Sequence, residues 1–136
     1  MEAGCLDVTL LAAPLSGAPP LALTPVTGSD HARVARAHRH RSDVHAGESE
    51  HGVLVVGRGL GDRWEVAFDV DPAARNAGHG RLLAAAARHL TPDGRATWAQ
   101  CAPGNASSLR VLLAAGYRPV GSEVILMPPG PATTRR

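Results

Sequence analysis

The chain has 136 residues, of which 44% are hydrophobic and 19% charged, a composition typical of one globular domain. No run of about 18 apolar residues occurs, which excludes a transmembrane helix. All 14 basic residues are arginine and the formal net charge is only +2, so charge does not indicate a nucleic-acid partner. Cys5 and Cys101 form no CxxC motif, which predicts free thiols in a cytoplasmic protein.

Proline residues crowd both ends of the sequence. We therefore predict an irregular N-terminal lead over residues 1–28, which holds at most one short strand near Leu6–Ala12. A flexible tail is predicted over residues 128–136. The ordered domain is then predicted over residues 29–127.

A short helix over His31–Arg41, capped by Asp30, and a short strand over Asp43–Ala46 open the predicted domain. The apolar run Val53–Val56 and the alternating segment Trp64–Val70 follow, separated by a glycine-rich turn. This arrangement predicts an antiparallel hairpin with a buried second strand.

Helices and strands alternate in the second half. Gly80–Leu90 has leucine and alanine at helical spacing, and Ala96–Ala102 has the pattern of a strand. A second helix is predicted from the N-cap Asn105 to Ala115, followed by an extended segment over Tyr117–Met127. The inward residues predicted for this second helix are Leu109, Leu112 and Leu113, and Gly116 is predicted to end the helix. The order predicts an α/β fold with a mixed sheet, antiparallel strands being followed by β-α-β-α-β.

The loop between Val70 and the helix Gly80–Leu90 carries the strongest functional signal. The first N–H groups of a helix have no partner within the helix, and with the helix dipole they form an anion site. Gly78 and Gly80 let backbone approach a diphosphate, and Arg75 and Arg81 flank the loop as donors. The sequence has no GxxxxGK[ST] motif, and the third glycine of the dinucleotide fingerprint is absent.

Two motifs support a family resemblance. Arg75 to Gly80 fits the phosphate-loop pattern R/Q-x-x-G-x-G/A, and Asn105 is followed at the family spacing by Gly116-Tyr117. Over residues 53–127 the sequence thus resembles the GCN5-related N-acetyltransferase (GNAT) superfamily. The resemblance implies a GNAT-like acyl-CoA N-acyltransferase fold with a reduced N-terminal part. It also implies acetyl-CoA as co-substrate, and it calls for no metal.

The resemblance further implies which residues hold coenzyme A. The strand end would bind the pantetheine arm, the loop would bind the pyrophosphate, and the asparagine would assist. These residues are Phe68 and Val70 for the arm, Arg75, Asn76, Ala77, Gly78, His79, Gly80 and Arg81 for the loop, and Asn105. For His79, a packed or exposed ring without a role is an equal alternative.

The implied reaction is direct attack of a neutral amine on the thioester, which needs a base but no covalent intermediate. Glu65 is the first candidate for that base, with a solvent-facing or ion-paired glutamate as the alternative, and Asp69 on the same face is second. Many family members carry a tyrosine acid where this chain has Leu112. Tyr117 is expected in the core, and Cys101 is expected to be a buried structural thiol.

The leading hypothesis is a cytoplasmic N-acetyltransferase for a primary amine of a small molecule, without nucleic-acid or membrane partners and with a homodimer left open. The first alternative is a non-catalytic, regulatory CoA-binding domain of the same fold. A second is a fragment that completes its sheet with a partner, because little sequence follows Met127. The five histidines between His31 and His51 are interpreted as a solvated polar segment, with no metal site.

Overall fold

The computed structural model describes residues 2–26 and 31–127. Seven strands form one sheet in the order β2-β3-β4-β5-β6-β1-β7. The strands are β1 Glu2–Ala12, β2 Thr24–Val26, β3 Ser42–Ser49, β4 Gly52–Arg58, β5 Trp64–Val70, β6 Thr97–Cys101 and β7 Arg118–Met127, and the helices are α1 Ala32–His40, α2 His79–Leu90 and α3 Ala106–Ala114. Neighbouring strands are antiparallel except β5 and β6, which are parallel, so the predicted α/β fold with a mixed sheet is confirmed.

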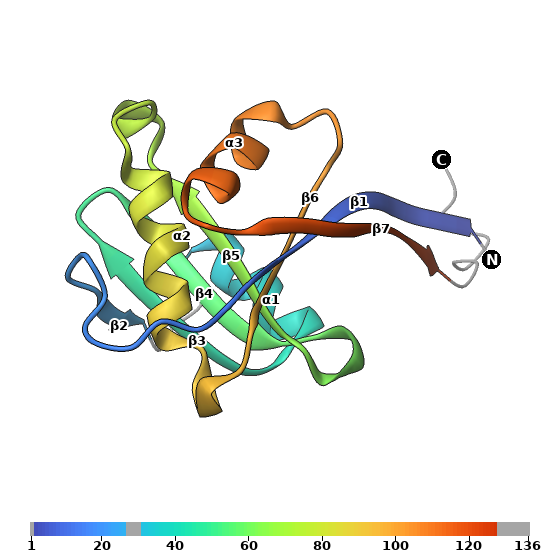
Figure 1. Cartoon of the computed structure of the whole chain (residues 1–136), viewed down its shortest axis with the longest axis horizontal. Coiled ribbons are helices and arrows are strands. Elements are labelled where there is room, and N and C mark those ends of the chain that lie inside the picture. Colours follow the sequence, from blue (N-terminus) through green and yellow to red (C-terminus); the bar gives the residue numbers. More distant parts are fainter. Residues whose placement is uncertain (1, 27–30, 128–136) are drawn as a thin grey trace.

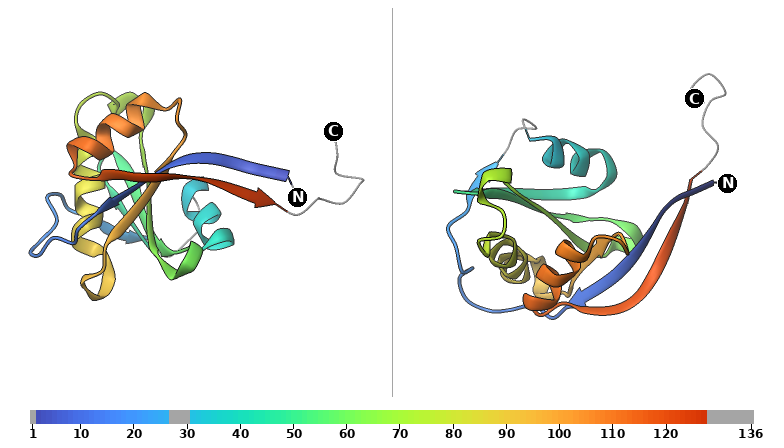
Figure 2. Two further views of the ribbon diagram at one scale, coloured as in Figure 1. Left: turned by 45° about the vertical axis from the view of Figure 1, so that its right-hand side comes forward. Right: turned by 90° about the horizontal axis from the view of Figure 1, so that it is seen from above.

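The helices form a layer on each side of the sheet (Figure 2, right). α2 and α3 lie on one face and cover the main core, which includes Leu54, Leu83 and Tyr117. α1 lies on the other face, where Val34 packs on Val55 of β4. No helix within the described residues is long and apolar enough to cross a membrane.

The strand expected near Leu6–Ala12 is present within the longer β1. The expectation that the rest of residues 1–28 is irregular is wrong, because β2 also lies there. β1 is inserted between β6 and β7, the last two of the described strands (Figure 1). Prolines begin only at Pro14, after β1 has ended, and Leu10 of β1 is fully buried in the main core. The second short strand, β2, pairs with β3. The partner of β7 is thus a strand of the same chain.

β5 and β6 pair only at their first residues, Trp64 with Thr97 and Glu65 with Trp98. Beyond this point β5 continues to Val70 without a partner on that side, so the two strands separate. The sheet therefore opens at the strand end that leads into the glycine loop.

The ends and faces of the helices agree with the sequence predictions in part. Asp30 and the tail over residues 128–136 lie outside the described residues. His31 caps α1, its Nδ1 accepting a hydrogen bond from the Arg33 N–H at 3.1 Å. Leu113 is 47% exposed, not inward as expected, since α3 buries Leu112 on its inner face. Gly116 follows α3 with a φ of +91°, as predicted for the residue that ends this helix.

Candidate functional site

The loop before α2 holds its backbone in an unusual shape. Asn76 and Gly78 have positive φ angles of 66° and 85°, on either side of Ala77. Such a reversal points successive N–H groups into one concavity. Among the described residues, the N–H groups of Gly78, His79, Gly80 and Arg81 have no backbone acceptor. The predicted loop residues thus come together as an array of free donors at a helix N-terminus, which suits a diphosphate.

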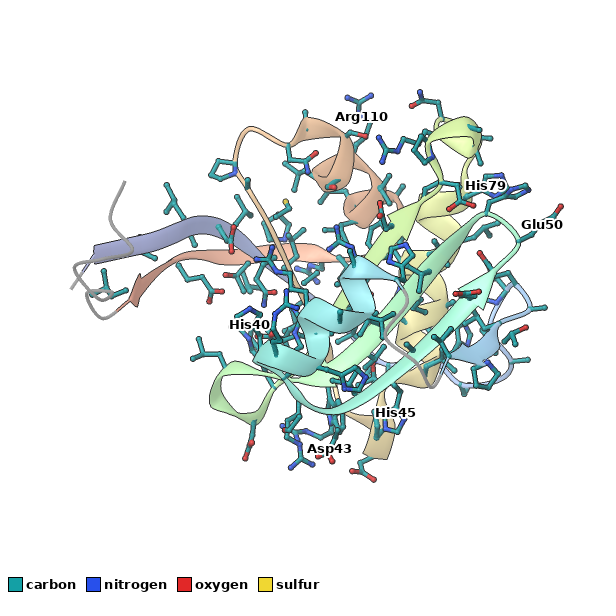
Figure 3. All side chains as sticks on the ribbon, turned by 180° about the vertical axis from the view of Figure 1, so that it is seen from behind. His40, Asp43, His45, Glu50, His79 and Arg110 are labelled. Atoms are coloured by element: carbon teal, nitrogen blue, oxygen red, sulfur yellow. The ribbon has the colours of Figure 1, made fainter. Side chains whose placement is uncertain are left out.

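Arginines surround this array. Arg75 donates from Nε to the Val70 carbonyl at 3.3 Å, while Arg81 extends from the first turn of α2. Arg110 of α3, labelled in Figure 3, was not found from the sequence. Neither Arg81 nor Arg110 forms an ion pair with any residue that the structure describes. Their charges are therefore available to a bound anion.

A hollow of about 240 Å³ lies between the loop and α3. It is lined by Asn76, Gly78, Arg81, Ser107, Arg110, Val111 and Ala114. No acidic side chain lines it. The signal that could have revealed Arg110 is its place in the helix that Asn105 opens, the element the sequence already linked to the loop.

Two predicted residues shape the site through the backbone. A Cβ atom on Gly80 would lie 3.4 Å from Cγ1 of Val111, an ordinary van der Waals distance, so the start of α2 lies close against α3. Asn105 accepts from the Ser108 N–H through Oδ1 at 3.1 Å and thereby fixes the start of α3. Phe68 and Val70 are half-buried against the main core and lie on the unpaired part of β5.

His79 contacts a residue that sequence reasoning did not link to it. Its ring centroid lies 4.2 Å from that of His51 in the turn between β3 and β4. The carbonyl of His51 accepts from the N–H of Asp71 at 2.8 Å. The turn therefore supports the loop from the side opposite to α3, and Figure 3 shows His79 beside the turn that carries Glu50.

Glu65 is buried and fully engaged. Its carboxylate accepts from Nε of Arg41 at 2.9 Å, from Nε of Arg63 at 2.7 Å and from Nε2 of Gln100 at 3.3 Å. Arg63 also donates two hydrogen bonds to Glu123 of β7. Burial opposes the charge of Arg63, but the hydrogen bonds to Glu123 and Glu65 outweigh it and raise the pKa of Arg63. The ion-paired alternative is thus present in the structure, and a role for Glu65 as base stays a prediction.

Asp69 lies closer to the open end of β5. Its side chain is 39% exposed, with Oδ2 at 4.0 Å from Nε2 of His31 and Oδ1 at 3.8 Å from Nη2 of Arg75. Because His31 uses Nδ1 to cap α1, we assign the proton of its neutral form to Nε2, facing Asp69. These contacts are long, so the carboxylate of Asp69 keeps lone pairs for a proton.

The residue at the position of the family's tyrosine acid, and the tyrosine and cysteine that remain as an acid and a nucleophile, are buried. Leu112 and Tyr117 lie in the main core, where the Tyr117 hydroxyl donates to the carbonyl of Ala84 at 2.9 Å. Cys101 is also in the core, and its burial, with a smaller effect of Asp7, raises the pKa of its thiol. This surrounding keeps Cys101 protonated at neutral pH, as expected of a structural thiol.

No protein-family profile and no curated protein sequence matches the chain. Among the solved structures that are similar is a protein of Novosphingobium aromaticivorans DSM 12444, assigned as an acetyltransferase of the GNAT family. It superposes with a TM-score of 0.56 at 13% identity, over 89% of this chain and 63% of that chain. The chain has the GNAT fold. The fold expected from the phosphate loop and the Asn105 helix is therefore confirmed, although this chain spans less than two thirds of that GNAT protein.

Within the GNAT fold of this chain, the glycine loop lies between β5 and α2, where the two motifs predicted it. Among residues 2–26 and 31–127 no group of three or more histidine, cysteine or acidic side chains could hold a metal ion. The histidines labelled in Figure 3 are spread over α1, β3 and the start of α2.

Proposed function

We propose that this protein is an acetyl-CoA-dependent N-acetyltransferase that acts on a primary amine of a small molecule. The observation that carries the proposal is the set of free N–H groups from Gly78 to Arg81 at the open end of β5. In the proposal these groups bind the pyrophosphate of acetyl-CoA. Arg81 and Arg110 bind the phosphate on its ribose, in the hollow between the loop and α3.

In the proposal, the unpaired part of β5 binds the pantetheine arm of the cofactor. Strand backbone at Phe68 and Val70 has no partner in β6, so its polar groups are available to the amide groups of a pantetheine arm. Arg75 now occupies the Val70 carbonyl and would turn to the diphosphate when acetyl-CoA binds. The thioester would then lie near Asp69.

The chemical step requires no enzyme nucleophile. The amine nitrogen attacks the thioester carbonyl carbon, the C–N bond forms, the C–S bond breaks and coenzyme A leaves as thiolate. We assign Asp69 as the group that takes the proton from nitrogen, while water protonates the thiolate. Glu65 acts in this scheme as a positioning residue, since three donors already use its lone pairs.

Two observations favour a second candidate, a non-catalytic CoA-binding domain. The carboxylate most suited to the family's base is saturated by donors, and Leu112 stands in the core at the position of the family's tyrosine acid. This candidate requires the same phosphate loop but no turnover.

One experiment separates these functions. The full chain is titrated by calorimetry with acetyl-CoA, with coenzyme A and with ATP, and thiol release is then followed across a panel of primary amines. Because the chain has no lysine, acetylation of its own lysines cannot contribute to thiol release. Binding with turnover supports the transferase, and binding without turnover across the panel supports the second candidate. An absence of binding at millimolar ligand would overturn both.

A further inference from the structure

A second and larger pocket lies away from the phosphate loop. A strap of residues 13–23 connects β1 to β2 and passes the C-terminal end of α2 (Figure 1). The strap, β3, β4 and the end of α2 enclose a partly open pocket of about 640 Å³. This volume falls within the range of about 300–1,000 Å³ that is typical of small-molecule sites.

The strap is fixed at both ends and free in the middle. At its start, the Leu15 N–H donates to the carbonyl of Arg88 at 2.8 Å, and Nε of Arg88 donates to the carbonyl of Ala13 at 2.9 Å. At its end, Pro25 pairs with Gly47 across β2 and β3. Between Ala18 and Leu23 it forms no hydrogen bond with the rest of the described chain. The two ends of the strap therefore hold this wall of the pocket in place, while its middle residues face the pocket without hydrogen bonds to the rest of the described chain.

The lining is aliphatic. Its side chains come from Ala18, Ala22, Leu23, Leu54, Val56, Leu90 and similar residues, without an aromatic ring other than His45 and without a carboxylate. Leu54 and Val56 are members of the main core, so the pocket floor is the core itself. Such a surface favours an alkyl chain.

One corner of the pocket is polar, and the side chains of Trp64 and Arg58 lie beside that corner without lining the pocket. His45 lines it, and the ring of Trp64 lies next to His45 with 6.5 Å between centroids. The guanidinium of Arg58 lies 5.2 Å above the Trp64 ring. Trp64 is 3% exposed. Among the described residues, Nε1 of Trp64 and Nε of Arg58 are buried atoms without a hydrogen-bond partner. Among the described residues, Arg58 forms an ion pair with Asp43, whose Oδ2 lies 3.6 Å from Nε of Arg58.

From this aliphatic hollow with His45 at one corner and the Trp64–Arg58 pair beside His45, we propose that the pocket binds a medium-chain aliphatic carboxylate. The alkyl chain lies between the strap and β4, and the carboxylate lies at the His45 corner, where the imidazole of His45 donates a hydrogen bond to it. This site is distinct from the phosphate loop, because α2 begins at the loop and ends at the pocket with Leu90.

The test uses the full chain with dodecanoate and dodecan-1-ol, titrated by calorimetry below their aggregation limits. We expect one saturable site per chain and binding of dodecanoate about tenfold tighter than that of the alcohol. Ala22→Phe fills the pocket from the strap and weakens both ligands by about tenfold or more. Ala13→Phe, the same change on the strap outside the lining, leaves both affinities unchanged. His45→Gln removes the preference for the carboxylate.

Several results would overturn the proposal. These are non-saturable binding of dodecanoate, equal loss in Ala13→Phe and Ala22→Phe, or an unchanged preference in His45→Gln. Binding of acetyl-CoA is measured on each variant as a separate readout. Retained acetyl-CoA binding with lost dodecanoate binding supports two independent sites, and failure of acetyl-CoA binding alone bears only on the proposed transferase.

Discussion

The guanidinium of Arg75 donates to the carbonyl oxygen of Val70 at 3.3 Å, so the first cation of the phosphate loop lies on the strand end before it. The same guanidinium lies 3.8 Å from the carboxylate of Asp69. A diphosphate in the loop would therefore compete for Arg75 with both partners. In the proposed function, cofactor binding thus frees the strand carbonyl and the base at the same time.

The first prediction concerns the loop. Gly78→Glu puts a negative charge into the array of free N–H groups, and we expect acetyl-CoA binding to weaken by about 100-fold. Gly94→Glu is the matched control, since Gly94 also has positive φ and, like Gly78, has nothing within 4 Å of an added Cβ. Both changes cost about 1–2 kcal/mol of backbone free energy, so only the difference in binding reports on the loop. Equal binding by the two variants would remove the loop as the cofactor site.

The second prediction separates the two carboxylates. Asp69→Asn is expected to lower kcat by about 100-fold with the unfolding temperature nearly unchanged, since Asp69 is partly exposed. Glu65→Gln is expected to lower the free energy of unfolding by about 1–3 kcal/mol, because Arg41 and Arg63 lose a buried charge. Steady-state kinetics and thermal melts of both variants check this. The reverse pattern would make Glu65 the base.

The third prediction tests the hollow between the loop and α3. We expect the protein to bind coenzyme A about tenfold more tightly than its 3′-dephospho form, and Arg110→Ala to remove most of that difference. Arg95→Ala, which changes an exposed arginine in another part of the chain, serves as the control. A ratio that persists in Arg110→Ala would place the ribose phosphate elsewhere.

The fourth prediction concerns the turn that leads into β4. A Cβ atom on Gly52 would collide with the carbonyl oxygen of Asp69 and lie 3.0 Å from Cδ1 of Leu83. Gly52→Ala should therefore lower the free energy of unfolding by about 1–3 kcal/mol, because strand backbone must shift. Gly121→Ala, where nothing lies within 4 Å of the added atom, should change it by less than about 0.5 kcal/mol. Urea denaturation of the pair checks this.

The fifth prediction is a loss of stability at alkaline pH. Burial raises the pKa of Tyr117, and the nearby Arg88 opposes this only in part. The folded state therefore keeps its proton above pH 10, where the unfolded phenol loses it, so stability is retained below about pH 10 and falls above it by up to about 1.4 kcal/mol per pH unit. With no lysine in the chain, few other groups titrate there.

Denaturation of the wild type and of Tyr117→Phe between pH 8 and 11 isolates this effect. The variant should be less stable by about 1 kcal/mol at pH 8, because it lacks the hydrogen bond to Ala84. The two curves should converge as the pH rises above 10. A constant gap would mean that the phenol titrates alike in both states.

Local patterns account for the part of the fold that the sequence predicted. The hairpin of β4 and β5, the helices α2 and α3 and the glycine loop all depend on spacing within a few residues. Gly116 ends α3 and Tyr117 lies in the core, both as expected. The same patterns carried the resemblance to the GNAT fold, because both motifs lie in this region.

Long-range pairing accounts for what was missed. Val8 of β1 pairs with Cys101 and with Ser122, and no pattern near Val8 indicates either partner. The partners of Glu65 come from the end of α1, from β6 and from the residue before β5. Arg110 lines the same hollow as Asn76 and Gly78 of the phosphate loop because α3 packs beside α2. Such contacts depend on the assembled sheet.

The place of β1 has a consequence for how the protein is made. Of the described strands β1 leaves the ribosome first, yet it pairs with β6 and β7, which are synthesised after the others. The N-terminal residues of β1 pair only with β7, as Glu2 does with Met127. These residues therefore have no strand partner until almost the whole described chain has been synthesised. The described sheet is therefore complete only after β7 has been synthesised, and until then the edge of β1 that pairs with β7 stays open to the wrong strand.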